Sequence, residues 1–136
     1  ITDGGGTPDP DPEPEPEPEP PANVFTNSTD VTIPDDNTWA TSRIPVTGRS
    51  GAAPADLKIS VDIKHTYRGD VVLEIVAPNG ASARLKSADY YDGADNLVAT
   101  YTINASSVAA NGTWTLRMAD AYRGDTGHLD SWSLTF

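Results

Sequence analysis

The sequence has 136 residues, a formal net charge of −11 and no cysteine, which fits one domain with a tail. The lack of cysteine excludes disulfides, thiolate chemistry and cysteine-based zinc sites. There is no run of about 18 apolar residues, so no membrane-spanning segment is expected. The excess of acidic residues argues against nucleic acid as a partner.

Residues 1–22 are predicted to be a flexible, acidic linker. They contain seven carboxylates and no basic residue, and residues 8–20 alternate proline with aspartate or glutamate. Proline at every second position fixes φ and removes amide donors, so neither helix nor sheet can form. A polyproline II segment of this length extends roughly 40 Å. We interpret it as a spacer behind an upstream domain of a longer precursor. A tail that only adds solubility and a ligand for a proline-binding module are the alternatives.

Residues 23–136 are predicted to form one β-sandwich domain, whose first strands are weak or lie at an edge, over 24–33 and 42–46. Strict alternation of aliphatic and polar side chains predicts a strand over 57–64. The run at 71–76 predicts the next strand, and the Pro78-Asn79-Gly80 turn leads to a partner strand over 83–86.

Three further strands are predicted in the second half of the domain. Residues 97–103 alternate again, and large apolar side chains share one face of the last two strands: Trp114, Leu116 and Met118, then Trp132, Leu134 and Phe136. No long window has helical periodicity, and turn residues recur about every 8–12 positions. We therefore predict an all-β fold, an antiparallel sandwich or jelly roll.

Three motifs in the domain are specific enough to suggest a family. They are His65-Thr66-Tyr67-Arg68-Gly69-Asp70 with the turn at 78–80, then Gly112-Thr113-Trp114, and finally Gly127-His128-Leu129-Asp130-Ser131-Trp132-Ser133-Leu134-Thr135-Phe136. Together they resemble the P domain (Homo B domain) that follows the catalytic domain of kexin- and furin-type convertases. Similar domains end many bacterial secreted serine proteases and metalloproteases. The likeness covers about residues 24–136.

The resemblance implies a jelly-roll β-sandwich of the galactose-binding-like kind and an accessory role without catalysis. Such a domain helps its protease to fold, stabilises it, tunes its calcium and pH dependence, or engages a protein substrate such as collagen. The expected partner is an upstream catalytic domain in the same secreted, extracellular precursor, either a subtilisin-like serine endopeptidase or a metalloprotease. In convertases the P domain packs tightly on that partner, whereas a rod of ~40 Å favours a tethered module.

Acidic residues in glycine-containing loops are the candidate metal ligands. We expect Asp70, Asp120 and Asp125 in the inner loops and Asp92 with Asp95 at a second site, and the segment 35–37 is a weaker third candidate. Calcium takes six to eight oxygen ligands, which such loops supply, although the spacing is not that of an EF-hand. We therefore predict structural calcium. Solvated turns capped by aspartate are the alternative.

Four tyrosines in the same loops are the candidate substrate-binding residues: Tyr67, Tyr90, Tyr91 and Tyr122. Tyrosine is suited to contact with sugar rings or peptide chains because it combines an apolar ring with a polar hydroxyl. The alternative is that Tyr67 and Tyr122 pack over the rim of the core.

The sequence gives no sign of a catalytic site. His65 and His128 are the only histidines, and neither a Gly-x-Ser-x-Gly elbow nor a His-Glu-x-x-His pair is present. We expect His65 to be a hydrogen-bonded structural residue. Tyr-Arg-Gly-Asp occurs at 67–70 and 122–125, and this repeat predicts two similar turns at one end of the sandwich.

The leading functional hypothesis is therefore a monomeric accessory domain of a secreted protease. A carbohydrate-binding module of a secreted hydrolase is the main alternative, because such modules share the expected fold and linker. A surface adhesin that presents one of the Arg-Gly-Asp segments is the third.

Overall fold

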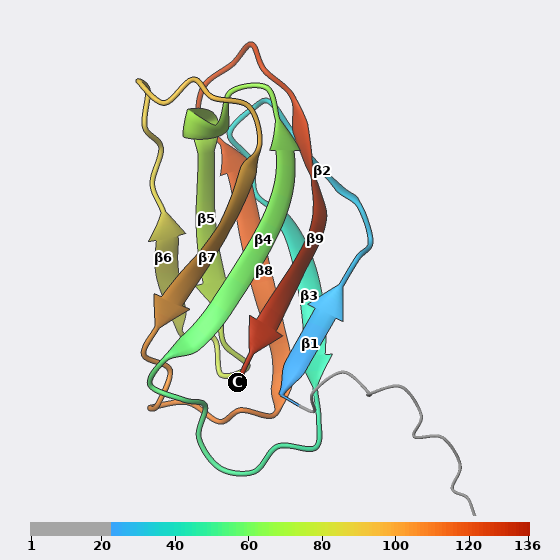
Figure 1. Cartoon of the computed structure of the whole chain (residues 1–136), viewed down its shortest axis with the longest axis vertical. Coiled ribbons are helices and arrows are strands. Elements are labelled where there is room, and N and C mark those ends of the chain that lie inside the picture. Colours follow the sequence, from blue (N-terminus) through green and yellow to red (C-terminus); the bar gives the residue numbers. More distant parts are fainter. Residues whose placement is uncertain (1–22) are drawn as a thin grey trace, which may run out of the picture.

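The computed structural model describes residues 23–136, which fold into two antiparallel sheets packed face to face (Figure 1). The first sheet contains β1 (Val24–Asn27), β2 (Val31–Ile33), β4 (Leu57–His65), β7 (Leu97–Ile103) and β9 (Gly127–Thr135). The second contains β3 (Ala40–Val46), β5 (Val71–Val76), β6 (Ser82–Lys86) and β8 (Gly112–Asp120). One turn of 3₁₀ helix, η1 (Arg68–Asp70), precedes β5. The predicted linker, residues 1–22, lies outside the described residues.

The strand order confirms an all-β fold of two antiparallel sheets. In the first sheet the order is β1-β9-β4-β7, and β2 also pairs with β9; in the second it is β3-β8-β5-β6. The strands predicted at 57–64, 71–76 and 97–103 are confirmed as β4, β5 and β7. The narrower assignment to a galactose-binding-like jelly roll stays a prediction. Within residues 23–136 there is no helix long and apolar enough to cross a bilayer.

The predicted strand over 24–33 is in fact two strands. The Asn27 side chain donates a hydrogen bond to the Arg43 carbonyl oxygen (2.8 Å) and accepts one from the Thr29 backbone N–H (2.9 Å). An asparagine bonded to the backbone two residues ahead makes a turn, which interrupts the strand after residue 27. The chain therefore leaves β9 between β1 and β2.

Alternating side chains of both sheets fill a continuous apolar core. Trp114 from β8 and Trp132 from β9 are each 1% exposed, and both indole N–H groups have partners. Trp132 Nε1 donates to the Ser42 hydroxyl (2.9 Å) and Trp114 Nε1 to the Ala110 carbonyl oxygen (2.9 Å). Burying two indoles without an unpaired donor lets the largest side chains of the domain sit at its centre.

Four connections lie at one end of the sandwich, whereas the first and last residues of the domain lie at the other. The connections β2–β3, β4–β5, β6–β7 and β8–β9 all meet at one end, drawn at the top of Figure 1. At the opposite end β1 begins beside the end of β9, where Val24 pairs with Thr135 and the Phe136 N–H bonds to the Asn23 carbonyl oxygen. We call the end where the four connections meet the loop end. The chain therefore comes into the domain at the end opposite the loop end.

Candidate functional site

Three buried polar side chains meet under the loop end. His65 is the last residue of β4, Asp70 the last of η1 and Asp120 the last of β8. They are 2%, 3% and 1% exposed, and their candidate ligand atoms lie within 4.8 Å of one another. Strands from both sheets thus place two carboxylates and one imidazole in the interior, where polar groups need partners.

The hydrogen bonds of His65 fix its tautomer. Its Nδ1 accepts a hydrogen bond from the Tyr67 backbone N–H (3.0 Å), so this nitrogen carries no proton. The proton is therefore on Nε2, which donates to Asp120 Oδ2 (2.9 Å). His65 is thus fully buried and hydrogen-bonded through both ring nitrogens, which is consistent with the predicted structural role.

The Asp70 carboxylate has no such partner. Among residues 23–136 it accepts no hydrogen bond and forms no ion pair, although its backbone N–H bonds to Tyr67 and its carbonyl oxygen to Ala121. Burial raises the pKa of the Asp70 carboxyl above its ordinary value, and the nearby charge of Asp120 raises it further. Burial also raises the pKa of Asp120, while the hydrogen bond from His65 opposes this. Within residues 23–136, neither Asp70 nor Asp120 forms an ion pair with a lysine or arginine side chain.

Two more carboxylates border this pair. Asp35, in the β2–β3 loop, accepts a hydrogen bond from the Gly124 N–H through Oδ2 (2.9 Å), and its Oδ1 is buried without a partner in the described part of the chain. Asp125, in the β8–β9 loop, accepts one from the Thr66 hydroxyl (2.8 Å). The charges of both raise the pKa of the Asp70 carboxyl. We call these four aspartates and their surroundings the carboxylate cluster.

The predicted second metal pair has a different arrangement. Both carboxylate oxygens of Asp92 face Arg68 Nε, at 2.9 and 3.1 Å, and this hydrogen bond holds the pKa of Asp92 below its ordinary value. Asp95 is exposed. Neither residue belongs to a group of three potential ligands among residues 23–136. The structure thus gives Asp92 a cationic partner of its own, and a metal site at Asp92 and Asp95 stays a prediction.

The first Arg-Gly-Asp segment is not presented to an external receptor. Arg68 is paired with Asp92, while Gly69 and Asp70 are buried under the neighbouring loop. An adhesive reading of this segment is therefore wrong for the folded domain, since its aspartate points inward.

Three of the four predicted tyrosines form an exposed patch, which we call the tyrosine rim. Tyr90 packs edge to face on Tyr91 and Tyr122, with ring centroids 5.5 and 5.4 Å apart. Their exposed fractions are 61%, 90% and 41% for Tyr90, Tyr91 and Tyr122. Tyr67 is half-buried, and its hydroxyl donates to the Tyr90 carbonyl oxygen. The structure therefore places Tyr67 beneath the rim as a support, in line with the alternative of packing.

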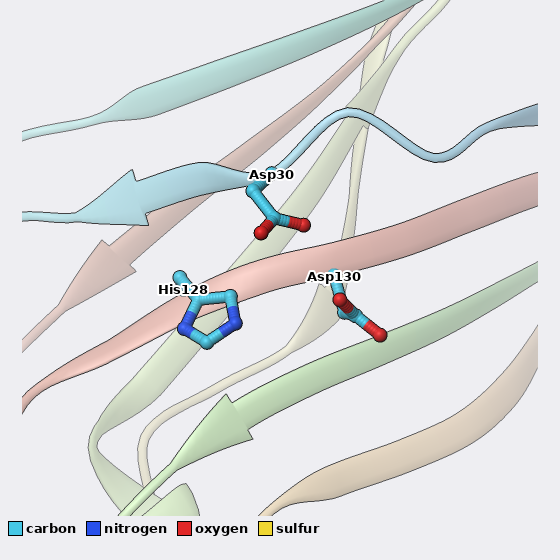
Figure 2. Close-up of side chains that lie close together, drawn as sticks. All are labelled: Asp30, His128 and Asp130. Atoms are coloured by element: carbon cyan, nitrogen blue, oxygen red, sulfur yellow. The ribbon is translucent and has the colours of Figure 1, made fainter.

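A second group of potential ligands lies on the outer face of the first sheet: Asp30, His128 and Asp130 (Figure 2). A β-bulge makes the register of β9 against β4 skip Asp130, and the pairing of β2 with β9 brings Asp30, the residue before β2, close to His128 and Asp130. This group was not predicted from the sequence, because only strand pairing shows that residues 30 and 128 are neighbours. Asp30 is exposed, so water solvates its charge, in contrast to the buried Asp70 and Asp120.

The fold and the site define the class: an antiparallel β-sandwich domain whose polar and aromatic residues gather in the loops at one end. Residues 54–136 match the family described as the proprotein convertase P-domain, and the chain belongs to this family. The predicted resemblance is confirmed.

Relatives that match this chain include bacterial proteases. The chain is 54% identical over 114 residues to the transglutaminase-activating metalloprotease of Streptomyces mobaraensis, covering 84% of this chain and 15% of that protein. It is 31% identical over 120 residues to a calcium-dependent protease of Nostoc sp., covering 82% and 18%. The fold is similar to that of the serine protease of Aeromonas sobria in complex with its chaperone, with a TM-score of 0.56, 18% identity, and coverage of 87% of this chain and 27% of that one.

The chain therefore spans less than a third of each of these relatives. Their names include a metalloprotease and a serine protease.

Proposed function

We propose that residues 23–136 are a non-catalytic accessory domain of a secreted, extracellular protease, joined by residues 1–22 to a catalytic domain in the same precursor. The observation that carries this proposal is the shared domain in protease relatives of which it makes up only 15–18% of the sequence. The closed hydrogen bonding of His65 supports a role without catalysis. The parent is a subtilisin-like serine endopeptidase or a metalloprotease, and the domain acts as a monomer with a jelly-roll fold.

The proposed role has two parts. The domain stabilises its protease, with calcium bound by loop carboxylates as a structural cofactor, and it contacts a protein substrate such as collagen. The tyrosine rim supports the second part, because it lies at the loop end, away from the point where residue 23 leads into β1 (Figure 1). A surface there remains free for an external partner.

A polypeptide is a suitable occupant of the tyrosine rim. Three tyrosine rings, of which Tyr90 contacts the other two, offer apolar faces and hydroxyl groups with little conformational entropy to lose, which favours contact with proline-rich or extended chains. Sugar rings stack on the same kind of surface. A carbohydrate-binding module therefore remains the second candidate function.

A pull-down of the full chain on insoluble collagen, casein, cellulose and chitin separates the two candidates. We expect retention on the protein matrices and about tenfold weaker retention for Tyr91→Ala, because an exposed aromatic anchor contributes at least ~1.4 kcal/mol to such contacts. Val98→Ala is the matched control, since Val98 is 70% exposed but lies on β7, within the first sheet. Retention only on cellulose or chitin would replace the protease-accessory proposal with the carbohydrate-binding one.

A further inference from the structure

The interior under the loop end contains negative charge that the described residues do not balance. Asp70 and Asp120 are 3% and 1% exposed, and within residues 23–136 the only ionisable partner of either carboxylate is His65. His65 is neutral, because its Nδ1 accepts the Tyr67 N–H and its single ring proton is used on Asp120. Buried carboxylates normally pair with a cation or bind a metal.

We infer that Asp70 and Asp120 are inner ligands of a bound calcium ion, and that Asp35, which lies outside the group of three whose ligand atoms are within 4.8 Å of one another, supplies a further ligand through Oδ1 when its loop closes on the ion. His65 does not contact the ion; it orients Asp120 through the hydrogen bond from Nε2. The proposed function includes structural calcium, and this site locates it. Only the identity of the ion rests on the proposed function.

Two independent observations point to a ligand here. The Asp70 carboxylate is almost fully buried, has no partner among residues 23–136 and lies within 4.8 Å of the ligand atoms of Asp120. Asp35 Oδ1 is also buried without a partner, although Oδ2 of the same side chain is bonded to Gly124. An oxygen left unpaired in a buried position is costly unless something outside the polypeptide binds it.

The donor atoms favour calcium over other cations. Both nitrogens of His65 are engaged and cysteine is absent, so carboxylate and backbone oxygens are the donors that remain. Oxygen-only sites suit the hard cations calcium and magnesium. The carboxylates come from separate segments, the β2–β3 loop, η1, the end of β8 and the β8–β9 loop, which suits the irregular coordination of calcium better than the strict octahedron of magnesium.

The ion would hold the two sheets together at the loop end. Asp35 follows β2 of the first sheet, whereas Asp70 and Asp120 flank β5 and β8 of the second. The Tyr122 N–H bonds to Asp120 Oδ1 (3.2 Å), so one of the proposed ligands also positions a tyrosine of the rim. Calcium is thus expected to order the surface that we propose for substrate contact.

Thermal unfolding of the full chain, in calcium and in EGTA, tests the site. We expect calcium at about 100 times its Kd to raise the Tm by roughly 10 °C, with one tight site in a calorimetric titration. Asp70→Asn should weaken calcium binding at least tenfold and abolish the Tm shift. In EGTA, however, Asp70→Asn should melt at a higher temperature than the wild type, because it removes an unpaired buried charge. A merely structural Asp70 predicts the opposite sign in EGTA.

Asp130→Asn is the matched control. It removes one carboxylate from the group of Asp30, His128 and Asp130, and the Tm shift on addition of calcium should be unchanged. The inference is overturned if calcium leaves the Tm unchanged, if magnesium gives an equal shift, if Asp70→Asn keeps the shift, or if Asp130→Asn loses it. A chain that is retained on casein or collagen yet shows no calcium shift would overturn this inference while leaving the proposed function intact.

Discussion

Replacing Trp132 with alanine is expected to lower the free energy of unfolding by about 3–5 kcal/mol, since a large core side chain is lost and a cavity remains. Trp132 is 1% exposed and pairs on β9 with both β1 and β4, so it lies at the centre of the first sheet. Its loss also removes the hydrogen bond to Ser42 (2.9 Å), which joins the two sheets. Because domains of this size have about 5–15 kcal/mol in total, the variant should be close to unfolding at 37 °C.

Urea denaturation followed by circular dichroism measures this loss. Trp39→Ala is the control, because Trp39 is 42% exposed and its ring packs against Arg117, with 4.7 Å from the guanidinium carbon to the ring centroid. We expect Trp39→Ala to cost about 1 kcal/mol or less. Equal costs for the two variants would contradict the assignment of Trp132 to the core.

Replacing Gly69 with alanine is expected to cost about 3 kcal/mol, by a different mechanism. A Cβ at this position would fall 2.5 Å from the Asp92 carbonyl oxygen and closer still to that of Asp89. The two segments cannot simply move apart, because the Gly69 N–H donates to Asp92 (2.9 Å) and its carbonyl oxygen accepts from the Asp89 N–H (2.7 Å). Overpacking and the loss of these hydrogen bonds add together.

Gly124→Ala is the matched control, since Gly124 occupies the same position in the second Tyr-Arg-Gly-Asp segment. There a Cβ would meet nothing within 4 Å, and only the positive φ of 115° opposes the substitution. Backbone strain of this kind costs about 1–3 kcal/mol. Chemical denaturation of both variants gives the comparison. If Gly69→Ala were the less destabilising of the two, the close packing of η1 against residues 89–92 would be disproved.

The repeated Tyr-Arg-Gly-Asp tetrapeptide shows where local sequence stops being informative. The prediction that both copies lie at one end of the sandwich is confirmed, but the prediction that their turns are similar is wrong. The first copy forms η1 and is buried by the 87–96 loop, whereas the second lies in the exposed β8–β9 connection with Gly124 at positive φ. Tertiary packing, which four residues do not encode, decides between the two conformations.

The strands were the most predictable part of the domain. In β4 every second side chain is aliphatic, from Leu57 to Ile63, and burial follows this alternation in the structure. Period 2 is a property of the strand itself, so it can be seen in the sequence before any partner is known. The interruption between β1 and β2 was not predicted, although the turn that Asn27 makes with the Thr29 N–H is local to the sequence.

The carboxylate cluster could be predicted only in part. Asp70 and Asp120 were predicted as ligands because they are acidic residues of the loops. Their proximity to each other, and that of Asp35 to Gly124, depends on tertiary packing. Asp92 looked equivalent from its glycine-containing loop, and only the structure shows that Arg68 already neutralises it. Which carboxylate lacks a partner is a property of the packed loops.

Secreted protease activity shows whether this P domain serves a protease. The precursor would be expressed with and without residues 23–136, and the total casein-hydrolysing activity secreted into the medium would be compared at equal cell density. This quantity combines the yield of folded enzyme with the activity of each molecule, so it responds to stabilisation and to substrate contact alike. We expect the activity of the truncated precursor to be at least about tenfold lower. A tenfold decrease corresponds to the loss of ~1.4 kcal/mol of favourable interaction. Equal activity from the two precursors would contradict the account.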